Sequence, residues 1–311
     1  MRRIVIVCNP RSSRYARVRR EVLDFLMNPN FLREKYGITG VTIFRYEVEP
    51  TNVDDNAMKL SKLLHDDDLV LSVGGDATGV IGLNAVMHSG KDAILAALPY
   101  GNFNDLARTL GIKKLDDVFK AETKKLYPLD VIVDDEHFRY ASCYVTVGMM
   151  AEAVELFDSK KVRTGLRKKK NRAVRSYFEL AKWYFCHRHK KVFLPDFKLN
   201  GDALFHKRSD YIAVNGKSLA RVIRGRHNAF QPDVFVRKIG KLTSFVRLVW
   251  FMAKGMLCRI SGEEVLREDT IEFIEPANVE IQAEGEYKKF ENLKKIQIKK
   301  SKDFIKVISL K

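Results

Sequence analysis

The sequence contains few cysteines, and they follow no pattern that would build a disulfide framework or bind a metal. The four cysteines lie far apart and never form a Cys-x-x-Cys pair: Cys8, Cys143, Cys186 and Cys258. Buried, reduced thiols are the simplest interpretation of such spacing. His187 and His189 are close in sequence, but no third ligand stands near them, so a metal site is not expected there.

Long apolar runs are also missing, since no stretch reaches the ~20 residues that a membrane-spanning helix needs. The first ten residues begin like a signal peptide, with Arg2 and Arg3 before an apolar stretch. That stretch is too short, however, and it runs into a polar turn at Asn9 and Pro10. We interpret it as the first buried strand of a sheet and expect a cytoplasmic protein.

Acidic residues are fewer than basic ones: 39 Asp and Glu stand against 56 Lys and Arg, which gives a net charge of +17. Such an excess attracts polyanions, whether nucleic acid, an anionic membrane surface or a phosphorylated ligand. The sequence has no helix-turn-helix, zinc-finger or RNA-binding signature, so we expect no nucleic-acid partner. A length of 311 residues with 46% hydrophobic residues indicates a globular protein of two domains.

The first 125 residues alternate short apolar strands with helical stretches. The expected strands cover residues 4–8, 41–46, 69–73 and 93–98, and the expected helices cover 15–27, 53–64, 79–87 and 105–110. Alternation of this kind predicts an α/β domain with a doubly wound, Rossmann-like parallel sheet. In such a sheet, ligands bind at the carboxyl ends of the strands.

From residue 126 to about residue 298 the pattern is rich in short β-strands. The expected strands of this part cover residues 129–133, 139–147, 191–199, 210–215, 270–274, 279–282 and 295–298, and a further strand is expected beyond it, over 304–309. They predict a second, mostly antiparallel β-sandwich domain, interrupted by helical insertions over 174–186 and 242–257. The last residues, about 299–311, can return to the first domain.

Two glycine-containing turns follow expected strands of the first domain. The first turn contains Gly74, Gly75, Asp76 and Thr78, and the second contains Gly101, Asn102, Asn104, Asp105 and Arg108. Glycine allows backbone N–H groups to approach a phosphate closely. Taken singly, each turn has a simpler interpretation, in which its polar residues only cap the following helix. Two such turns in succession favour a nucleotide site and phosphoryl transfer.

These motifs resemble the diacylglycerol kinase catalytic-domain family of lipid kinases, which also includes sphingosine and ceramide kinases. The family's Gly-Gly-Asp-Gly-Thr turn is matched by residues 74–78, and its Pro-x-Gly-Thr-x-Asn-Asp-x-x-Arg segment by residues 99–108. Asn9 and Ser12 match its Asn-Pro-x-Ser-Gly entry turn. Residues 284–286, Glu-Gly-Glu, stand where the family has Asp-Gly-Glu. The motifs occur in the family's order and extend over nearly the whole chain.

The resemblance implies an ATP-dependent lipid kinase with ATP between the two domains. The entry turn and both glycine turns would bind the nucleotide, and Asp105 is the residue assigned to Mg2+. Glu286, supported by Asp130, would accept the proton from a lipid hydroxyl as the phosphoryl group transfers. Without the resemblance, Glu286 is a solvated hairpin residue and Asp130 a carboxylate at the end of a strand.

The sequence departs from the family pattern at several positions. Ala77 replaces the third glycine, and a methyl group there is harmless only if φ is negative. Asn102 replaces a threonine, Val80-Ile81 replaces an Asn-Glu pair, and Glu284 replaces an aspartate. The family's Asp-Gly-Leu-Asp segment, which is linked to a structural metal, is absent. A catalytically inactive, membrane-binding homologue is therefore one alternative.

The most basic segment, from Lys160 to Arg172, precedes a stretch rich in Tyr, Phe and Trp. Basic residues beside aromatic ones suit the interface of an anionic membrane, with a second contact expected around Trp250. The alternative is an exposed basic loop followed by a helix whose aromatic residues pack in the core. We expect a protein of lipid metabolism, including phospholipid biosynthesis, that associates peripherally with the membrane. A homodimer is compatible with the sequence.

A second enzymatic alternative is an NAD-kinase-like enzyme, because that superfamily also contains Gly-Gly-Asp. The segment from Asn104 to Arg108 and the Glu284-Gly285-Glu286 turn favour the lipid kinases. The expected acceptor is a lipid with a free hydroxyl, and the sequence does not select one among diacylglycerol, monoacylglycerol, sphingoid bases and ceramide.

Overall fold

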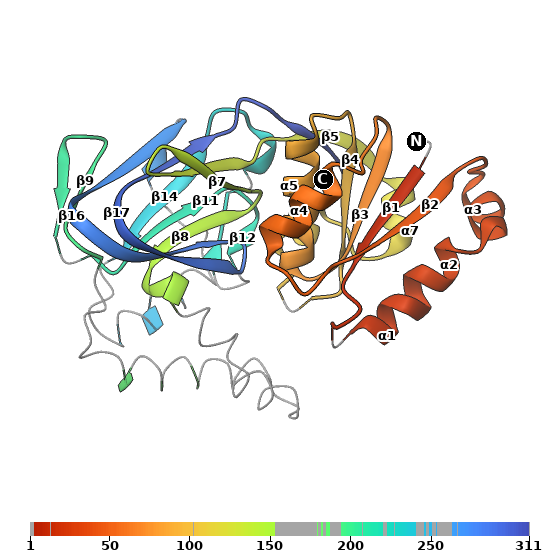
Figure 1. Ribbon diagram of the computed structural model, residues 1–311, viewed down its shortest axis with the longest axis horizontal. Helices are drawn as coiled ribbons and strands as arrows, with labels where there is room; N and C mark the ends of the chain where they lie inside the picture. Colours follow the sequence, from red (N-terminus) through yellow and green to blue (C-terminus); the bar gives the residue numbers. More distant parts are fainter. Residues whose placement is uncertain are drawn as a thin grey trace.

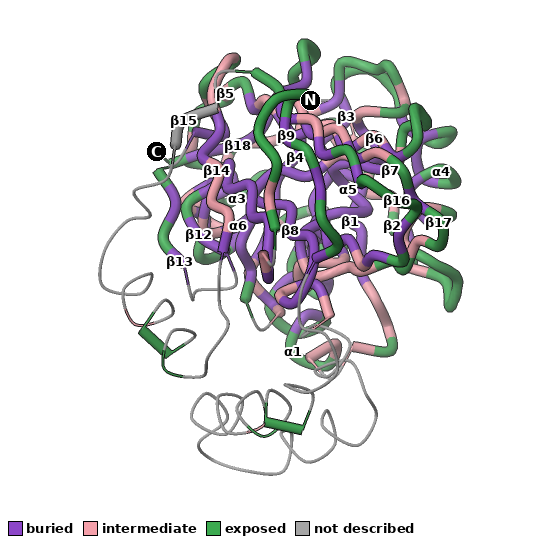
Figure 2. The backbone as a smooth tube through the Cα atoms, turned by 90° about the vertical axis from the view of Figure 1, so that its left-hand side faces the viewer, coloured by how far each residue is buried: buried purple, intermediate pink, exposed green. Residues whose placement is uncertain are grey.

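The computed structural model describes residues 3–12, 14–101, 103–152, 194–206, 208–219, 223–226, 228–240, 263–265 and 267–310. It also describes isolated residues at 179, 182, 185–186, 246, 249–250 and 253. Two lobes lie side by side, one with helices around a sheet and one built from long strands (Figure 1). Buried backbone, drawn purple in Figure 2, runs through the interior. In the described part of the chain, no helix is both long and apolar enough to cross a bilayer.

The N-terminal lobe contains a six-stranded sheet in the order β2-β1-β3-β4-β18-β5. Its strands are β1 (Arg3–Cys8), β2 (Thr42–Glu47), β3 (Asp68–Gly74), β4 (Ile94–Pro99), β5 (Glu122–Leu126) and β18 (Ile305–Ser309). All neighbours are parallel except β5, which runs antiparallel to β18. The strand order reverses around β1, and in open α/β sheets such a reversal opens a crevice where ligands bind.

Eight helical segments belong to this lobe. They are α1 (Tyr15–Val18), η1 (Arg19–Leu23), α2 (Asp24–Leu26), α3 (Pro29–Tyr36), α4 (Val53–Ser61), α5 (Asp76–Ser89), α6 (Asp105–Leu110) and α7 (Leu115–Lys120). The first three follow one another directly, so the expected single helix over 15–27 contains a π-helical turn at η1. The predictions did not include α3, α7 or β5. Helix α5 begins at Asp76, three residues earlier than predicted, because Gly75 serves as its extended N-cap.

The second lobe is a large antiparallel sheet in the order β15-β14-β11-β8-β16-β17-β6-β7, to which β9 and β10 are added. Its strands are β6 (Leu129–Val133), β7 (Glu136–Ala141), β8 (Tyr144–Gly148), β9 (Phe197–Leu199), β10 (Ala203–Phe205), β11 (Asp210–Val214), β14 (Phe235–Gly240), β15 (Glu263–Val265), β16 (Glu268–Ala283) and β17 (Glu286–Lys300). The small pair β12 (Ser218–Leu219) and β13 (Ile223–Arg224) and the 3-10 turn η2 (Asn228–Phe230) lie beside it. The predicted fold class, α/β followed by antiparallel β, is confirmed.

Several strand boundaries differ from the prediction. The expected strand over 139–147 is divided into β7 and β8, because Ser142 and Cys143 leave the ladder between them. The two expected strands over 270–274 and 279–282 are one long strand, β16, whose register shifts between Glu272 and Val279. Most of the two predicted helical insertions, over 174–186 and 242–257, lies outside the described residues.

The chain crosses between the lobes twice, and the two crossings contact each other. The Ser301 N–H donates to the Pro128 carbonyl at 2.9 Å, so the outgoing and returning segments are hydrogen-bonded. Lys300 is buried beside them, and its Nζ donates to the Tyr127 carbonyl at 2.9 Å and the Asn228 carbonyl at 3.0 Å. Burial lowers the pKa of Lys300 to about 7. After this crossing, β18 enters the first sheet between β4 and β5.

Candidate active site

The candidate site begins where three adjacent strands end. The register places Cys8 beside Val73 and Gly74 beside Pro99, so β1, β3 and β4 end at one edge of the sheet. The entry turn and the two glycine turns follow these ends, and the sheet brings together three motifs that are far apart in the sequence. This edge is where parallel α/β sheets place their ligands.

The two glycine turns pack directly against each other. A Cβ placed on Gly101 would lie 2.2 Å from the Cα of Gly75, and one placed on Gly75 would lie 3.2 Å from the Cα of Gly101. At Gly74, an added Cβ would collide with the side chain of Thr78. The glycines are therefore required by this close backbone approach, in addition to any role near a phosphate.

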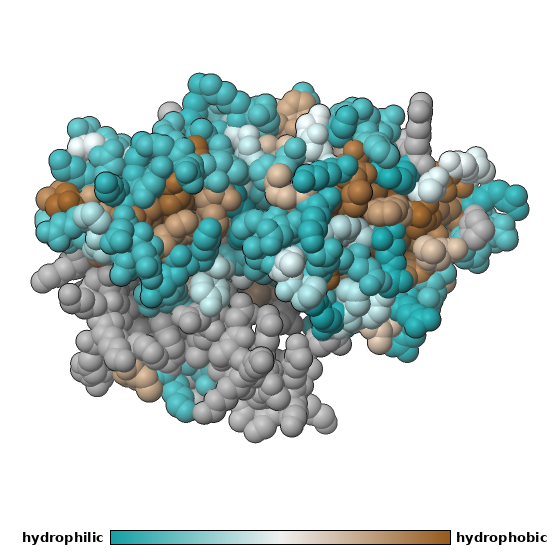
Figure 3. Space-filling model, viewed as in Figure 1, coloured by the Kyte–Doolittle hydropathy of each residue, from teal (hydrophilic) through white to brown (hydrophobic). Residues whose placement is uncertain are grey.

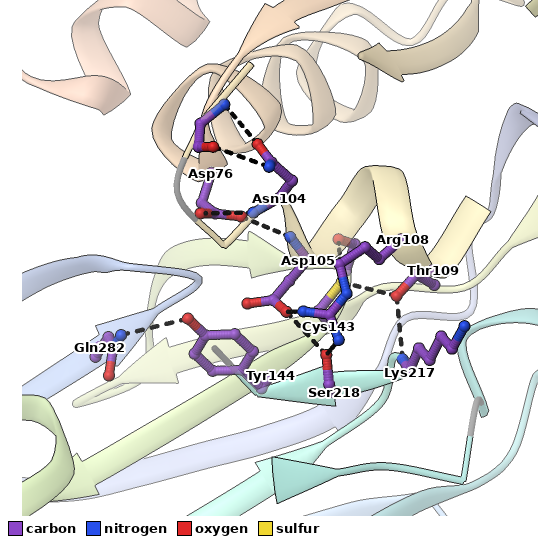
Figure 4. Close-up of polar contacts among 12 residues, drawn as sticks. Asp76, Asn104, Asp105, Arg108, Thr109, Cys143, Tyr144, Lys217, Ser218 and Gln282 are labelled. Atoms are coloured by element: carbon purple, nitrogen blue, oxygen red, sulfur yellow. Dashed lines mark hydrogen bonds and ion pairs between the residues drawn. The ribbon is translucent and has the colours of Figure 1, made fainter. Parts of the chain in front are cut away.

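Asp76 holds the second turn in place through its carboxylate. It accepts hydrogen bonds from the backbone N–H groups of Asp105, at 2.7 Å, and Asn104, at 3.2 Å (Figure 4). Asn104 has a left-handed backbone, with φ of 55°, and its side chain bonds both the N–H and the carbonyl of Gly101. Burial raises the pKa of Asp76, and these backbone donors act against that rise.

The N-terminus of α5 fits an anion. Gly75 precedes the helix in an extended conformation and has no side chain to cap it. Helix α5 is 14 residues long, and its first N–H groups and dipole favour negative charge. Ala77 lies in the first turn of the helix and does not have a positive φ, so its methyl group introduces no backbone strain.

The entry turn contributes a residue that the sequence interpretation did not include. Asn9 accepts a hydrogen bond from the Arg11 N–H, and the Ser12 carbonyl accepts one from Tyr15 at the start of α1. Arg14 then donates from Nη1 to the Gly101 carbonyl at 2.7 Å. This contact brings a guanidinium to the second glycine turn, which adds positive charge at the candidate phosphate site.

Asp105 and Arg108 form an ion pair that a residue of the second lobe completes. Nη1 of Arg108 lies 3.1 Å from Oδ1 of Asp105, whose side chain is 1% exposed. The Ser218 hydroxyl donates to that same Oδ1 at 2.9 Å and accepts from Nη2 of Arg108 at 2.7 Å (Figure 4). Ser218 belongs to β12, and no motif in the sequence pointed to it.

The Glu284-Gly285 turn of the second lobe lies against the first glycine turn. Both residues have positive φ, 52° and 87°, which is the geometry of a two-residue hairpin turn between β16 and β17. A Cβ placed on Gly285 would lie 3.7 Å from the Cβ of Asp76. The predicted C-terminal motif therefore meets the Gly-Gly-Asp turn across the lobe boundary, and Glu286 follows as the first residue of β17.

Glu284 is buried in this turn, which is unusual for a glutamate. Its Oε1 accepts from the Ser142 hydroxyl at 2.5 Å and from the Cys143 backbone N–H. Burial is the main reason that the pKa of Glu284 is raised to about 7, and the nearby Asp76 carboxylate adds to the rise. The sequence showed Glu284 only as a replacement of aspartate and gave no sign of this burial.

Asp130 does not lie opposite Glu286 in the sheet. The β6–β17 ladder pairs Asp130 with Lys299, at the other end of β17. Its carboxylate contacts Nδ1 of His137 at 2.8 Å and lies 3.6 Å from Nζ of Lys299. The register therefore gives Asp130 other partners than the one expected for it.

Acidic side chains surround the buried ring of Tyr144. Burial is the main cause of the raised pKa of Tyr144, followed by the negative charges of Asp105, Asp76 and Glu284.

No group of three or more His, Cys, Asp or Glu side chains in the described part of the chain is arranged to hold a metal ion. The assignment of Mg2+ to Asp105 thus stays a prediction. Asn102 and the basic segment from Lys160 to Arg172 lie outside the described residues.

Comparison with known proteins agrees with the motifs. Residues 3–132 match the family model described as the diacylglycerol kinase catalytic domain. The resemblance seen in the sequence is confirmed. The match covers the N-terminal lobe up to β6 and includes both glycine turns and Asp130. No curated protein matches the chain significantly.

Solved structures extend the likeness to the whole chain. A diacylglycerol kinase from Bacillus anthracis str. Sterne is 14% identical with a TM-score of 0.62, and the alignment covers 99% of this chain and 97% of that one. Another protein from the same strain, proposed to be a diacylglycerol kinase, is 15% identical with a TM-score of 0.65 and the same coverage. At this identity the likeness shows a shared two-lobed fold. The family match supports a lipid-kinase-like function and the use of a nucleotide.

Proposed function

We propose that this diacylglycerol kinase-like protein is an ATP-dependent lipid kinase. It transfers the γ-phosphoryl group to the hydroxyl of a diacylglycerol-like lipid at the membrane surface. The observation that carries the proposal is the contact between the Glu284-Gly285 turn and Asp76, because Glu286 is the residue that directly follows this turn.

The residues present fit the phosphate part of a nucleotide. The uncapped N-terminus of α5, together with Arg14 and Arg108, provides N–H donors and positive charge at the carboxyl edge of the sheet. Bound Mg·ATP would supply the phosphoryl group and neutralise its charge. Asp76 positions the second glycine turn through two backbone hydrogen bonds, and Glu286 would accept the proton of the lipid hydroxyl.

Contact with an anionic membrane is the second part of the proposal. Val246, Val249 and Trp250 are helical, are spaced so that they share one helix face, and are 75%, 47% and 71% exposed. Exposed Trp and Val beside many basic residues suit the interface of a bilayer. Hydrophilic side chains cover most of the described face in Figure 3, with hydrophobic side chains gathered in a few patches over both lobes. Peripheral association with the cytoplasmic face of the membrane follows from this proposal.

A transfer assay tests the proposed function directly. Purified protein is incubated with γ-labelled ATP, Mg2+ and mixed micelles of a total lipid extract, and labelled lipids are separated. Labelled phospholipid that depends on the protein is the expected result. Label on NAD and not on lipid would favour the NAD-kinase-like alternative, whereas nucleotide binding without any transfer would favour the inactive homologue.

The membrane contact has its own test, sedimentation with vesicles. Wild-type protein should sediment with vesicles that contain anionic lipid more than with neutral ones, and Trp250→Ala should sediment less. Phe304→Ala, which changes another partly exposed aromatic residue, is the control. Equal sedimentation of the wild type and Trp250→Ala would remove this face from the proposal.

A further inference from the structure

A short segment of the second lobe reaches across to helix α6 of the first. Asn215, Gly216, Lys217 and Ser218 join the end of β11 to β12. The Lys217 backbone N–H donates to Oγ1 of Thr109 at 3.0 Å, and a Cβ placed on Gly216 would lie 2.8 Å from that same Oγ1. The segment therefore touches α6 along its last turn, with no room for a larger residue at position 216.

The hydroxyl of Ser218 completes a closed triangle with Asp105 and Arg108. It donates to Oδ1 of Asp105 at 2.9 Å and accepts from Nη2 of Arg108 at 2.7 Å, while the two charged groups are 3.1 Å apart. Ser218 is 1% exposed, so water cannot readily replace it. Hydrogen bonds that involve an ionised partner are stronger than neutral ones, and in a buried network they reinforce one another.

The other end of the same segment contacts the connection between β7 and β8, whose residues bind Glu284. The side-chain amide of Asn215 donates to the Ser142 carbonyl at 2.8 Å, and its backbone N–H donates to the Cys143 carbonyl at 2.7 Å. Ser142 and Cys143 are the residues whose hydroxyl and N–H bind Glu284. One four-residue segment therefore connects the Asp105 carboxylate of the first lobe with the Glu284 carboxylate of the second.

We propose that Ser218 is a positioning residue of the phosphoryl-transfer site. It holds Asp105 and Arg108 in one orientation at the proposed nucleotide site, and the segment that carries it links them, through Asn215, to the residues that bind Glu284. The inference rests on the proposed function, since it assigns the pair to nucleotide binding. Ser218 acts through its hydrogen bonds to these two residues and is not proposed to contact the substrate.

The experiment compares Ser218→Ala with Ser218→Thr, which retains a hydroxyl. Calorimetry measures the binding of ADP with and without Mg2+, and the transfer assay gives kcat and KM for ATP. In Ser218→Ala we expect the affinity for Mg·ADP to fall about tenfold, with a smaller change for ADP alone, because Asp105 loses a buried donor. Ser218→Thr should restore most of the loss. Ser61→Ala is the control, since Ser61 is also buried but its hydroxyl bonds only the Met58 carbonyl in its own helix.

Three results would overturn the inference. The first is wild-type binding of Mg·ADP by Ser218→Ala, and the second is an equal loss in both Ser218 variants, which would indicate packing instead of the hydroxyl. The third is a wild-type protein that binds no Mg·ADP. Failure of the proposed function is distinguishable, because it would leave Mg·ADP binding intact in the wild type with no phosphate transferred to lipid. Thermal unfolding of each variant, expected within a few degrees of the wild type, shows that the variants are folded.

Discussion

The two lobes hold their buried carboxylates in different ways. In the first lobe, Asp76 lies at the N-terminus of a long helix and accepts two backbone N–H bonds from the second glycine turn, 28 and 29 residues further along the chain. In the second lobe, Glu284 depends on a hydroxyl and an N–H from residues more than 140 positions away. Burial raises the pKa of both carboxylates, to about 7 for Glu284, and the hydrogen bonds that each accepts act against the rise. The two groups therefore differ in where their partners come from along the chain.

The largest effect is expected at Glu286, the proposed base that the second lobe contributes to the site. Glu286→Gln removes the proposed proton acceptor, so the rate of lipid phosphorylation should fall roughly 10²- to 10⁴-fold. Nucleotide binding and vesicle sedimentation should not change, because those contacts belong to other residues. The transfer assay, calorimetry and sedimentation measure the three properties separately. Wild-type activity in this variant would remove Glu286 as the base.

The next largest effect is expected in the first lobe, at the contact between the glycine turns. In Gly101→Ala the new Cβ would lie 2.2 Å from the Cα of Gly75, which is backbone and cannot rotate away. We expect a loss of about 1–3 kcal/mol in the free energy of unfolding, measured in urea, together with weaker nucleotide binding.

Gly79→Ala is the matched control for that variant. Gly79 lies in α5, about one turn after Gly75, and its added Cβ would meet only the Leu106 side chain, at 3.4 Å. Alanine also has the higher helix propensity, so this change should be neutral or slightly stabilising. Equal destabilisation by the two substitutions would contradict the argument that backbone contact between the turns requires Gly101.

The contact between the lobes themselves is tested at Asn84. Its side chain, on α5, bonds the carbonyl of Tyr140 at 3.0 Å and accepts from the Tyr140 N–H at 2.9 Å, so it continues the β7 edge. Asn84→Ala leaves two partly buried backbone groups of Tyr140 without this partner and should cost about 1–3 kcal/mol in urea unfolding. Asp54→Ala is the comparison variant, and it leaves the Arg139 side chain, which is 5% exposed, without the carboxylate that accepts from its Nε and Nη2. This variant should cost at least as much, because it leaves a buried charge unpaired. A smaller loss at Asp54 than at Asn84 would contradict the importance of this ion pair in the lobe contact.

The smallest effect concerns how the free energy of unfolding depends on pH, and it tests the environment of the buried Glu284 carboxylate. The pKa of Glu284 is about 7 in the folded protein against 4.5 for an ordinary glutamate, so the folded state binds more protons between these values. Glu284 should therefore make the protein less stable as the pH rises from about 5 to 7. Glu284→Gln should flatten this fall, by on the order of 1 kcal/mol, in urea unfolding at pH 5, 6, 7 and 8. Burial also raises the pKa of Asp210 to about 7, so this residue should likewise lower the stability as the pH rises. Asp210→Asn tests the same expectation at a second position. If a variant keeps the pH dependence of the wild-type stability, the replaced carboxyl group is not one whose pKa is raised on folding.

Much of the first lobe could be predicted because its signals are local. The strands at 4–8 and 69–73 are apolar runs buried on both faces, and they correspond to β1 and β3 within one residue at each end. The sequence pattern does not predict α3, although Asn28 caps it and Pro29 occupies its first turn, because the helix expected before it extends to residue 27 and leaves one residue between the two. In the second lobe the turns give weaker boundaries, and the pattern predicts one strand where the structure has β7 and β8.

The sequence alone determined which residues make up the motifs and their order along the chain, because glycine turns and strand periodicity are properties of neighbouring residues. Only the tertiary structure decided which of these residues meet. It placed the Glu284-Gly285 turn on Asp76, gave Asp105 and Arg108 a partner in Ser218, and paired Asp130 with Lys299. The physical reason is that sheet register and lobe packing join positions separated by a hundred residues or more. No local pattern in the sequence records those distances.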